Sequence, residues 1–148
     1  MFVINGMPHI FRAMLCDGDK PTVESTARGL GVRLPPDAKP DLLPDSKGLV
    51  LPNTGGMSVA PRWQDLPFYR IPRRLKHFVR EASGANGLAC WRFATIPFVN
   101  GPVALQLTLR IDGPRHGLIE PATPMQAGDF QTALGATQLL WFIDESYL

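Results

Sequence analysis

The chain has 148 residues, 45% of them hydrophobic and 19% charged, with a formal net charge of +2. These values exclude a disordered chain and predict one globular domain over residues 1–148, while so weak a charge does not by itself indicate nucleic-acid or membrane binding. Proline accounts for 15 residues, about twice its usual frequency of roughly 5%, which excludes a bundle of long uninterrupted helices.

The sequence shows no sign of a disulfide framework, a metal site or a membrane span. Cys16 and Cys90 lie far apart, and the three histidines have no zinc-ligand spacing with each other or with the cysteines. Residues 1–10 lack the basic start and long apolar core of a signal peptide, and no apolar run approaches the roughly 20 residues that cross a bilayer. We therefore expect a cytoplasmic protein, in the producing cell or in a target cell, with no membrane partner.

The first third of the chain is predicted to hold one strand, one short helix and one long loop. Residues 11–15 are apolar except for Arg12 and indicate an early strand. Residues 22–30 predict a short helix with a threonine cap and a glycine stop. Residues 35–44 contain four prolines, which predict an irregular loop.

A strand and a glycine turn are predicted next. Residues 48–52 indicate a short buried strand that a proline ends. The turn at 53–59 contains Gly55 and Gly56, and a glycine pair lets the backbone adopt positive φ or approach a ligand closely.

The segment over residues 61–80 is basic and punctuated by proline. With Asp65 as the one acidic residue among them, its arginines and lysines are Arg62, Arg70, Arg73, Arg74, Lys76 and Arg80. Arginine suits bidentate recognition of phosphates and carboxylates. Around the denser basic run at 70–80, Tyr69 and Phe78 are the interleaved aromatic residues, which is sparse for stacking on bases. A solvated face is therefore the preferred interpretation, and a nucleic-acid partner is the weaker alternative.

The second half of the chain is predicted to begin with strands. Residues 90–94 indicate a strand. Residues 103–111 alternate apolar and polar side chains, which predicts a single strand with one buried face. A turn at 112–114 and a short strand at 116–120 complete a predicted hairpin over 103–120.

A helix is predicted at the C-terminus. It begins near Thr123 and Pro124, and its core-facing side chains are Phe130, Leu134 and Trp141. The fold class that follows is α+β, with a compact β-rich core of short strands, few helices and a C-terminal helix. The sequence contains no P-loop, no Rossmann fingerprint and no serine-hydrolase elbow.

Three ordered blocks carry a resemblance to a known family. They are FRAM (residues 11–14), GLVLPNTGGMSV (48–59) and HGLIEPATPM (116–125). In order and rough spacing they resemble a family of small bacterial toxins that the type VI secretion system delivers and whose fold is like that of mono-ADP-ribosyltransferases. The resemblance implies a cytotoxic effector with an ADP-ribosyltransferase-like split sheet, NAD as its substrate and an unidentified cellular target. A cognate immunity protein is a further partner that the resemblance allows.

The resemblance implies a site of four side chains. Arg12 matches the arginine of the family's first strand, and His116 matches a histidine of its third block. Ser58 matches the serine of a Thr-Ser pair that toxicity requires, although Met57 stands where the threonine would be. Glu120 has no carboxylate counterpart in the toxin that the blocks resemble, but ADP-ribosyltransferases generally use a glutamate near the end of the site.

The predicted residues have two roles, the binding of NAD and the catalysis of its cleavage, and two of them have both. The predicted NAD-binding residues are Arg12, Gly55, Gly56, Ser58 and His116. The predicted catalytic residues are Glu120, His116 and Ser58. An arginine can clamp the pyrophosphate, and a carboxylate can stabilise the oxocarbenium-like state that forms as nicotinamide leaves. His116 and Glu120 are four residues apart on a predicted strand, which places them on the same face.

Each of these residues also has a purely structural explanation. Arg12 would be ion-paired, Ser58 would cap its turn, and His116 and Glu120 would lie on a solvated strand end. The competing function is a non-catalytic toxin or partner-binding module of the same fold that acts through the arginine-rich segment. The two functions differ in whether Glu120 and Arg12 converge on one open cleft.

Overall fold

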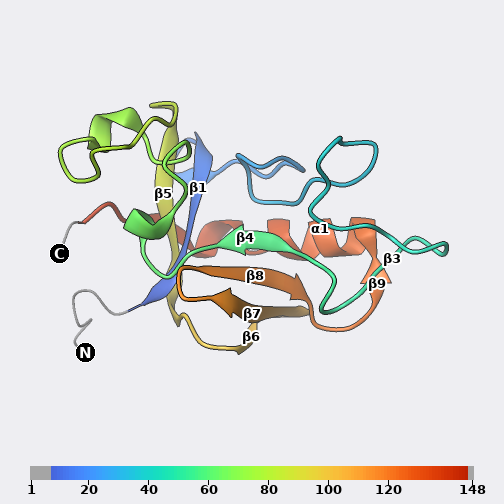
Figure 1. The fold of residues 1–148 in the computed structure, drawn as a ribbon. Coiled ribbons are helices and arrows are strands. Elements are labelled where there is room, and N and C mark those ends of the chain that lie inside the picture. The colour runs from blue at the N-terminus through green and yellow to red at the C-terminus, as the bar shows by residue number, and fades with distance from the viewer. Residues whose placement is uncertain (1–7, 147–148) are drawn as a thin grey trace.

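The computed structural model describes residues 8–146 as three antiparallel sheets and one C-terminal helix, with 38% strand and 13% helix (Figure 1). The predicted α+β, β-rich fold class is confirmed. The main sheet, in the order β10-β5-β1-β2, consists of β1 (His9–Asp17), β2 (Lys20–Pro21), β5 (Leu88–Pro97) and β10 (Trp141–Ile143). The second sheet, in the order β4-β8-β7-β6, consists of β4 (Met57–Val59), β6 (Gly101–Ala104), β7 (Leu107–Gly113) and β8 (His116–Pro121).

The remaining elements are short, apart from the C-terminal helix. A third sheet pairs β3 (Leu49–Val50) with β9 (Met125–Gln126), and β9 leads directly into α1 (Ala127–Gly135). The 3₁₀ helices are η1 (Trp63–Asp65), η2 (Arg73–Leu75) and η3 (Gln138–Leu140).

Strand β1 lies at the centre of the main sheet, and both of its faces are buried. Ile10 and Met14 pack into the main core, while Phe11 and Ala13 pack into a second, smaller core around Trp63. A strand that is covered on both faces is apolar at consecutive positions. This double burial explains the apolar run that predicted the strand.

The two large sheets meet beside β1. In Figure 1 the strands of the second sheet are directed crosswise to β1 and β5 and extend away from them to the right. Just beyond β4, Ala60 forms an isolated bridge with Phe11, in which each backbone N–H donates to the other's carbonyl oxygen at 2.8–2.9 Å. The bridge brings the end of β4 alongside the middle of β1, where Arg12 and Ser58 come together.

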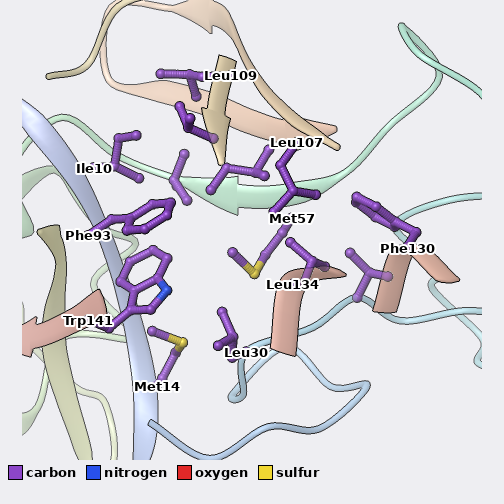
Figure 2. Close-up of a cluster of buried hydrophobic side chains, with 14 of the residues drawn as sticks. Ile10, Met14, Leu30, Met57, Phe93, Leu107, Leu109, Phe130, Leu134 and Trp141 are labelled. Carbon is purple, nitrogen blue, oxygen red and sulfur yellow. The ribbon is translucent and has the colours of Figure 1, made fainter. Parts of the chain in front are cut away.

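One core joins both sheets to α1 (Figure 2). Met57 contributes from the second sheet, Phe93 from the main sheet, and Phe130 and Leu134 from α1, and each is at most 1% exposed. The predicted burial of the two helix side chains is therefore confirmed.

The ends of the C-terminal helix differ from the prediction. The helix begins at Ala127, after Gln126, so Thr123 does not cap it, and it ends at Gly135. Trp141 is buried as predicted but lies on β10, where its ring stacks on Phe93 at a centroid distance of 4.7 Å.

The predicted single strand over residues 103–111 is wrong, because the segment folds as β6 and β7. Gln106 adopts a φ of +66° between the two strands, and Leu105 is 86% exposed. Val103 and Leu107 face the core on either side of the turn, whereas Leu105, between them in sequence, points to solvent. The predicted hairpin is confirmed in the antiparallel pairing of β7 with β8.

The predicted helix over residues 22–30 is also wrong. The segment consists of bends and turns, which the hydrogen bond from the Leu30 N–H to the Thr22 carbonyl closes at 2.8 Å. The irregular loop over 35–44 is confirmed, and β3 and β5 lie at the strands predicted at 48–52 and 90–94.

Two further features bear on the sequence predictions. Both cysteines are free thiols. Between residues 8 and 146, no helix is both long and apolar enough to cross a membrane. Most of the segment tested for a signal peptide, residues 1–7, lies outside the described residues.

Candidate functional site

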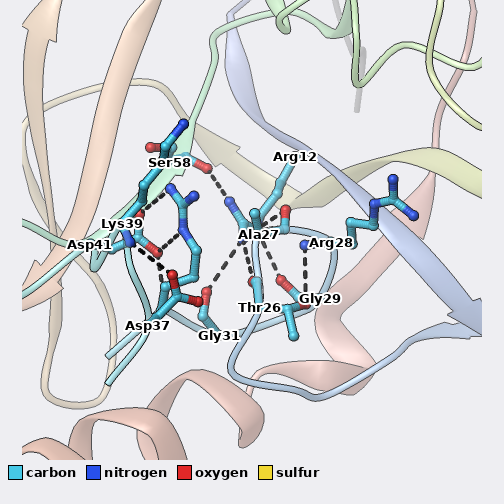
Figure 3. Close-up of polar contacts among 11 residues, drawn as sticks. Arg12, Thr26, Ala27, Arg28, Gly29, Gly31, Asp37, Lys39, Asp41 and Ser58 are labelled. Atoms are coloured by element: carbon cyan, nitrogen blue, oxygen red, sulfur yellow. Dashed lines mark hydrogen bonds and ion pairs between the residues drawn. The ribbon is translucent and has the colours of Figure 1, made fainter. Parts of the chain in front are cut away.

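The guanidinium of Arg12 is the centre of the candidate site. Strand β1 carries it between the loop 26–31 and strand β4 (Figure 3). Its Nε donates to the Gly29 carbonyl at 3.1 Å, and its Nη1 donates to the Ser58 carbonyl at 2.8 Å. Its Nη2 lies 3.3–3.4 Å from further carbonyl oxygens of the loop, those of Thr26, Ala27 and Gly31. These carbonyl groups fix the plane of the guanidinium.

The charge of Arg12 is buried without a neutralising partner. The residue is 7% exposed, and no carboxylate between residues 8 and 146 forms an ion pair with it. Burial lowers the pKa of Arg12 to about 10, against the opposing effect of nearby Asp41, so the guanidinium stays protonated at neutral pH. Carbonyl dipoles satisfy its N–H groups but leave a full positive charge in place.

Arg12 lines a cleft of about 350 Å³, which falls within the range of roughly 300–1,000 Å³ typical of small-molecule sites. The cleft lies among β1, β4, η1, the segment between η1 and η2, the loops before β4 and the turn between β7 and β8. Its polar lining consists of Arg12, Arg33, Asp41, Ser58, Asp65, Tyr69, Arg70, Arg115 and His116. Four arginines face two aspartates, so the lining carries a formal excess of two positive charges.

The arginines of the cleft differ in how firmly they are paired. Arg33 forms a close ion pair with Asp41 at 2.8 Å. Arg115 is 80% exposed and lies 3.8 Å from Asp65, which is too long for a hydrogen bond. Arg70 lies over the ring of the preceding tyrosine at 5.2 Å and forms no ion pair with the described residues. Positive charge at the cleft is therefore available from Arg70 and Arg115 as well as from Arg12.

The structure brings Arg12, Ser58 and His116 to this one cleft. Ser58 pairs with Leu118 across β4 and β8, and its hydroxyl makes no hydrogen bond to residues 8–146. Nδ1 of His116 lies 2.6 Å from the Asp112 carboxylate, which orients the ring and leaves Nε2 without a protein partner among those residues. A hydroxyl and an imidazole nitrogen are thus available beside the guanidinium groups.

Glu120 does not line the cleft. Its side chain is 1% exposed, and both carboxylate oxygens lie 3.0 Å from Nε of Arg110 on β7. Glu120 and His116 are four residues apart on β8, which places them on the same face of the strand. The ion pair with Arg110, however, neutralises the Glu120 carboxylate. The expected convergence of Glu120 and Arg12 on one open cleft is therefore not found.

Gly55 and Gly56 approach the protein backbone rather than the cleft. Gly55 has a φ of +146°, and a Cβ at this position would overlap the carbonyl oxygen of Asp41. A Cβ at Gly56 would overlap the carbonyl oxygen of Ile119. The glycine pair lets the chain pack closely against the loop at residue 41 and against β8, and neither glycine lines the cleft.

Several cleft residues gave little signal in the sequence. Arg33 precedes the proline-rich loop over 35–44 and Asp41 lies within it, and this part of the chain has no periodicity. Asp65 stood out as the acid of the basic segment, and Arg115 precedes His116, but neither position pointed to a cleft. Their juxtaposition depends on contacts between distant parts of the chain.

The basic segment divides among different environments. Arg70 lines the cleft, while Arg74 forms an ion pair with Glu145 at 2.6 Å and holds the C-terminal segment. Arg73 and Lys76 are exposed and line no part of the cleft. The solvated-face interpretation thus fits Arg73 and Lys76.

The described residues, 8–146, contain no group of three or more His, Cys, Asp or Glu side chains arranged to hold a metal ion. No protein-family model matches the chain, and no curated protein matches it. The function is therefore argued from the chemistry of the cleft and from the family resemblance of the sequence.

Proposed function

We propose that the cleft binds NAD and that the chain is a cytotoxic effector that transfers ADP-ribose from NAD to a cellular target, or to water. The observation that carries the proposal is the buried, unneutralised charge of Arg12 at a cleft with an excess of two positive charges. A pyrophosphate carries two negative charges at neutral pH and accepts charge-assisted hydrogen bonds from guanidinium groups. The resemblance to ADP-ribosyltransferase-like toxins supplies the choice of NAD among anionic ligands.

The cleft residues have distinct roles in this proposal. Arg70 and Arg115 donate hydrogen bonds to the pyrophosphate, and the buried charge of Arg12, whose N–H groups are held by backbone carbonyls, attracts it. The hydroxyl of Ser58 and Nε2 of His116 hydrogen-bond to ribose hydroxyls. Tyr69, which is 65% exposed, offers a ring face on which a base can stack.

Binding without turnover is the second candidate function, and the position of Glu120 favours it. The carboxylate predicted to stabilise the ribosyl cation is buried against Arg110 and outside the cleft. In this case the protein recognises an anionic group of a cellular partner through the same arginines.

Release of nicotinamide separates the two candidates. We expect purified protein to release nicotinamide when it is incubated with NAD. In a separate titration, we expect it to bind ADP-ribose, the other product of NAD cleavage. Saturable ADP-ribose binding without nicotinamide release would favour the non-catalytic function. Protein that neither binds ADP-ribose nor releases nicotinamide would contradict the NAD proposal.

The substitution Arg70→Gln is expected to weaken ADP-ribose binding about tenfold, because it removes one charge-assisted contact. Arg73→Gln is the matched control, since it removes the same charge from the same segment outside the cleft. Calorimetric titration of both variants measures the difference. Equal affinities for the two variants would mean that Arg70 does not contact the ligand.

A further inference from the structure

The cleft contains two carboxylates, and the oxygens of the first, Asp41, are already occupied. One oxygen accepts hydrogen bonds from the backbone N–H of Arg33 at 2.7 Å and from its Nε at 3.3 Å. The other accepts from Nη2 of Arg33 at 2.8 Å. A carboxylate engaged in this way has little capacity left to stabilise a second cation.

Asp65 is the other carboxylate of the cleft, and its one ion pair among residues 8–146 is a long contact with Arg115. No residue between 8 and 146 donates a hydrogen bond to it, and the nearest guanidinium, that of Arg115, lies 3.8 Å away. Its side chain is 19% exposed, so it is partly removed from solvent.

The backbone holds Asp65 firmly in place. It ends η1 between two buried side chains, Trp63 at 1% and Leu66 at 6% exposure. Its own N–H donates to the Arg62 carbonyl at 3.1 Å. A fixed charge needs no reorganisation to stabilise a charge that develops beside it, which is what electrostatic catalysis requires.

We propose that Asp65, rather than Glu120, is the carboxylate that stabilises the ribosyl cation. This inference rests on the proposed NAD function and names the catalytic residue within it. The long contact with the exposed Arg115 is weak, so the Arg115 side chain can move to contact the pyrophosphate. The Asp65 carboxylate then faces the ribose.

The step balances without an oxidant or a reductant. The bond between ribose C1′ and the pyridinium nitrogen breaks, and its electron pair stays on the nitrogen, so nicotinamide leaves neutral. The oxygen of water, or a nucleophile of the target, forms the new bond to C1′. The proton that it loses passes to solvent, so the step balances while Nε2 of His116 stays on the ribose.

The test compares Asp65→Asn with Glu120→Gln, both of which keep the shape of the side chain and remove its charge. We expect Asp65→Asn to lower the rate of nicotinamide release at saturating NAD about 10²–10³-fold. ADP-ribose affinity should stay within about threefold of wild type, and the melting temperature should be nearly unchanged. Asp65→Glu, which restores the charge at a longer reach, should recover part of the rate. Glu120→Gln should retain turnover when assayed as folded protein.

The outcomes distinguish this inference from the function on which it rests. Wild-type turnover that Asp65→Asn keeps, or that Glu120→Gln alone abolishes, overturns the role of Asp65 and leaves the NAD function standing. Wild-type protein that binds ADP-ribose but releases no nicotinamide overturns the role of Asp65 and leaves only the binding function. Wild-type protein that does not bind ADP-ribose overturns both.

Discussion

The substitution Arg12→Met is expected to destabilise the protein by about 2–4 kcal/mol and to weaken NAD binding on the order of 100-fold. Methionine fills a similar volume but leaves the carbonyl groups of the loop 26–31 and of Ser58 without their donor. Relief of the buried charge offsets part of the cost. The exposed lone pairs then lie beside the cleft, where they repel a pyrophosphate.

Chemical denaturation and calorimetry measure these two effects, and Arg12→Lys serves as the matched variant. Lysine keeps the charge but cannot span both the loop and β4 as the planar guanidinium does, so we expect intermediate stability. The Leu30 amide, which closes the loop onto Thr22, should exchange with solvent faster in Arg12→Met. Unchanged exchange and stability would show that Arg12 does not organise this loop.

The substitution Trp141→Ala is expected to cost about 3–5 kcal/mol of unfolding free energy. Trp141 is 2% exposed, stacks on Phe93, and donates from Nε1 to the Thr137 hydroxyl at 2.9 Å. Truncation therefore leaves a large cavity between β10 and the helix end, and it also removes this hydrogen bond. Thermal melting should show a fall of about 10 °C in Tm for a domain of this size.

The neighbouring position on β10 provides the control for Trp141. Phe142 is 51% exposed, so Phe142→Ala removes an aromatic ring from the same strand without opening a core cavity. We expect a change of less than about 1 kcal/mol. If the two variants melt alike, Trp141 is not part of the central core.

The local patterns predicted the strands better than the loops and the ends of elements. Residues 11–15 and 90–94 are apolar because β1 and β5 are the covered centre of the main sheet. The alternation over 103–111 concealed the turn at Gln106, because Val103 and Leu107 face the core on either side of it while the exposed Leu105 has the same residue type as a core position. The turn depends on the positive φ of Gln106, and the residue types around Gln106 do not predict that backbone angle.

Residues 22–30 do not form the predicted helix, and contacts with Arg12 of strand β1 contribute to this difference. The Leu30 N–H donates to the Thr22 carbonyl instead of the Thr26 carbonyl that a helix would offer, and Arg12, 14 residues away in sequence, donates to the Thr26 carbonyl. Such a contact is invisible to local propensity. The same guanidinium that was predicted to bind a ligand thus also shapes the loop that lines the cleft.

The candidate site was predicted in part. Arg12, Ser58 and His116 do meet, because β4 pairs with β8 and its end bridges to β1. Glu120 lies on the predicted face, but the diagonal neighbour Arg110 on β7 binds it. That pairing depends on strand register, which residue spacing along one strand does not reveal.

Calorimetric titration of ADP-ribose, which contains the pyrophosphate but no nicotinamide to release, into the wild-type protein at low and at moderate salt is the most direct test of the central claim. The arginines of the cleft predict one saturable site per chain, with an affinity that falls as salt screens their charges. Arg70→Gln should weaken this binding, and Arg73→Gln should not. Absence of saturable binding, or binding that is insensitive to salt and to Arg70→Gln, would contradict the assignment of this cleft to NAD.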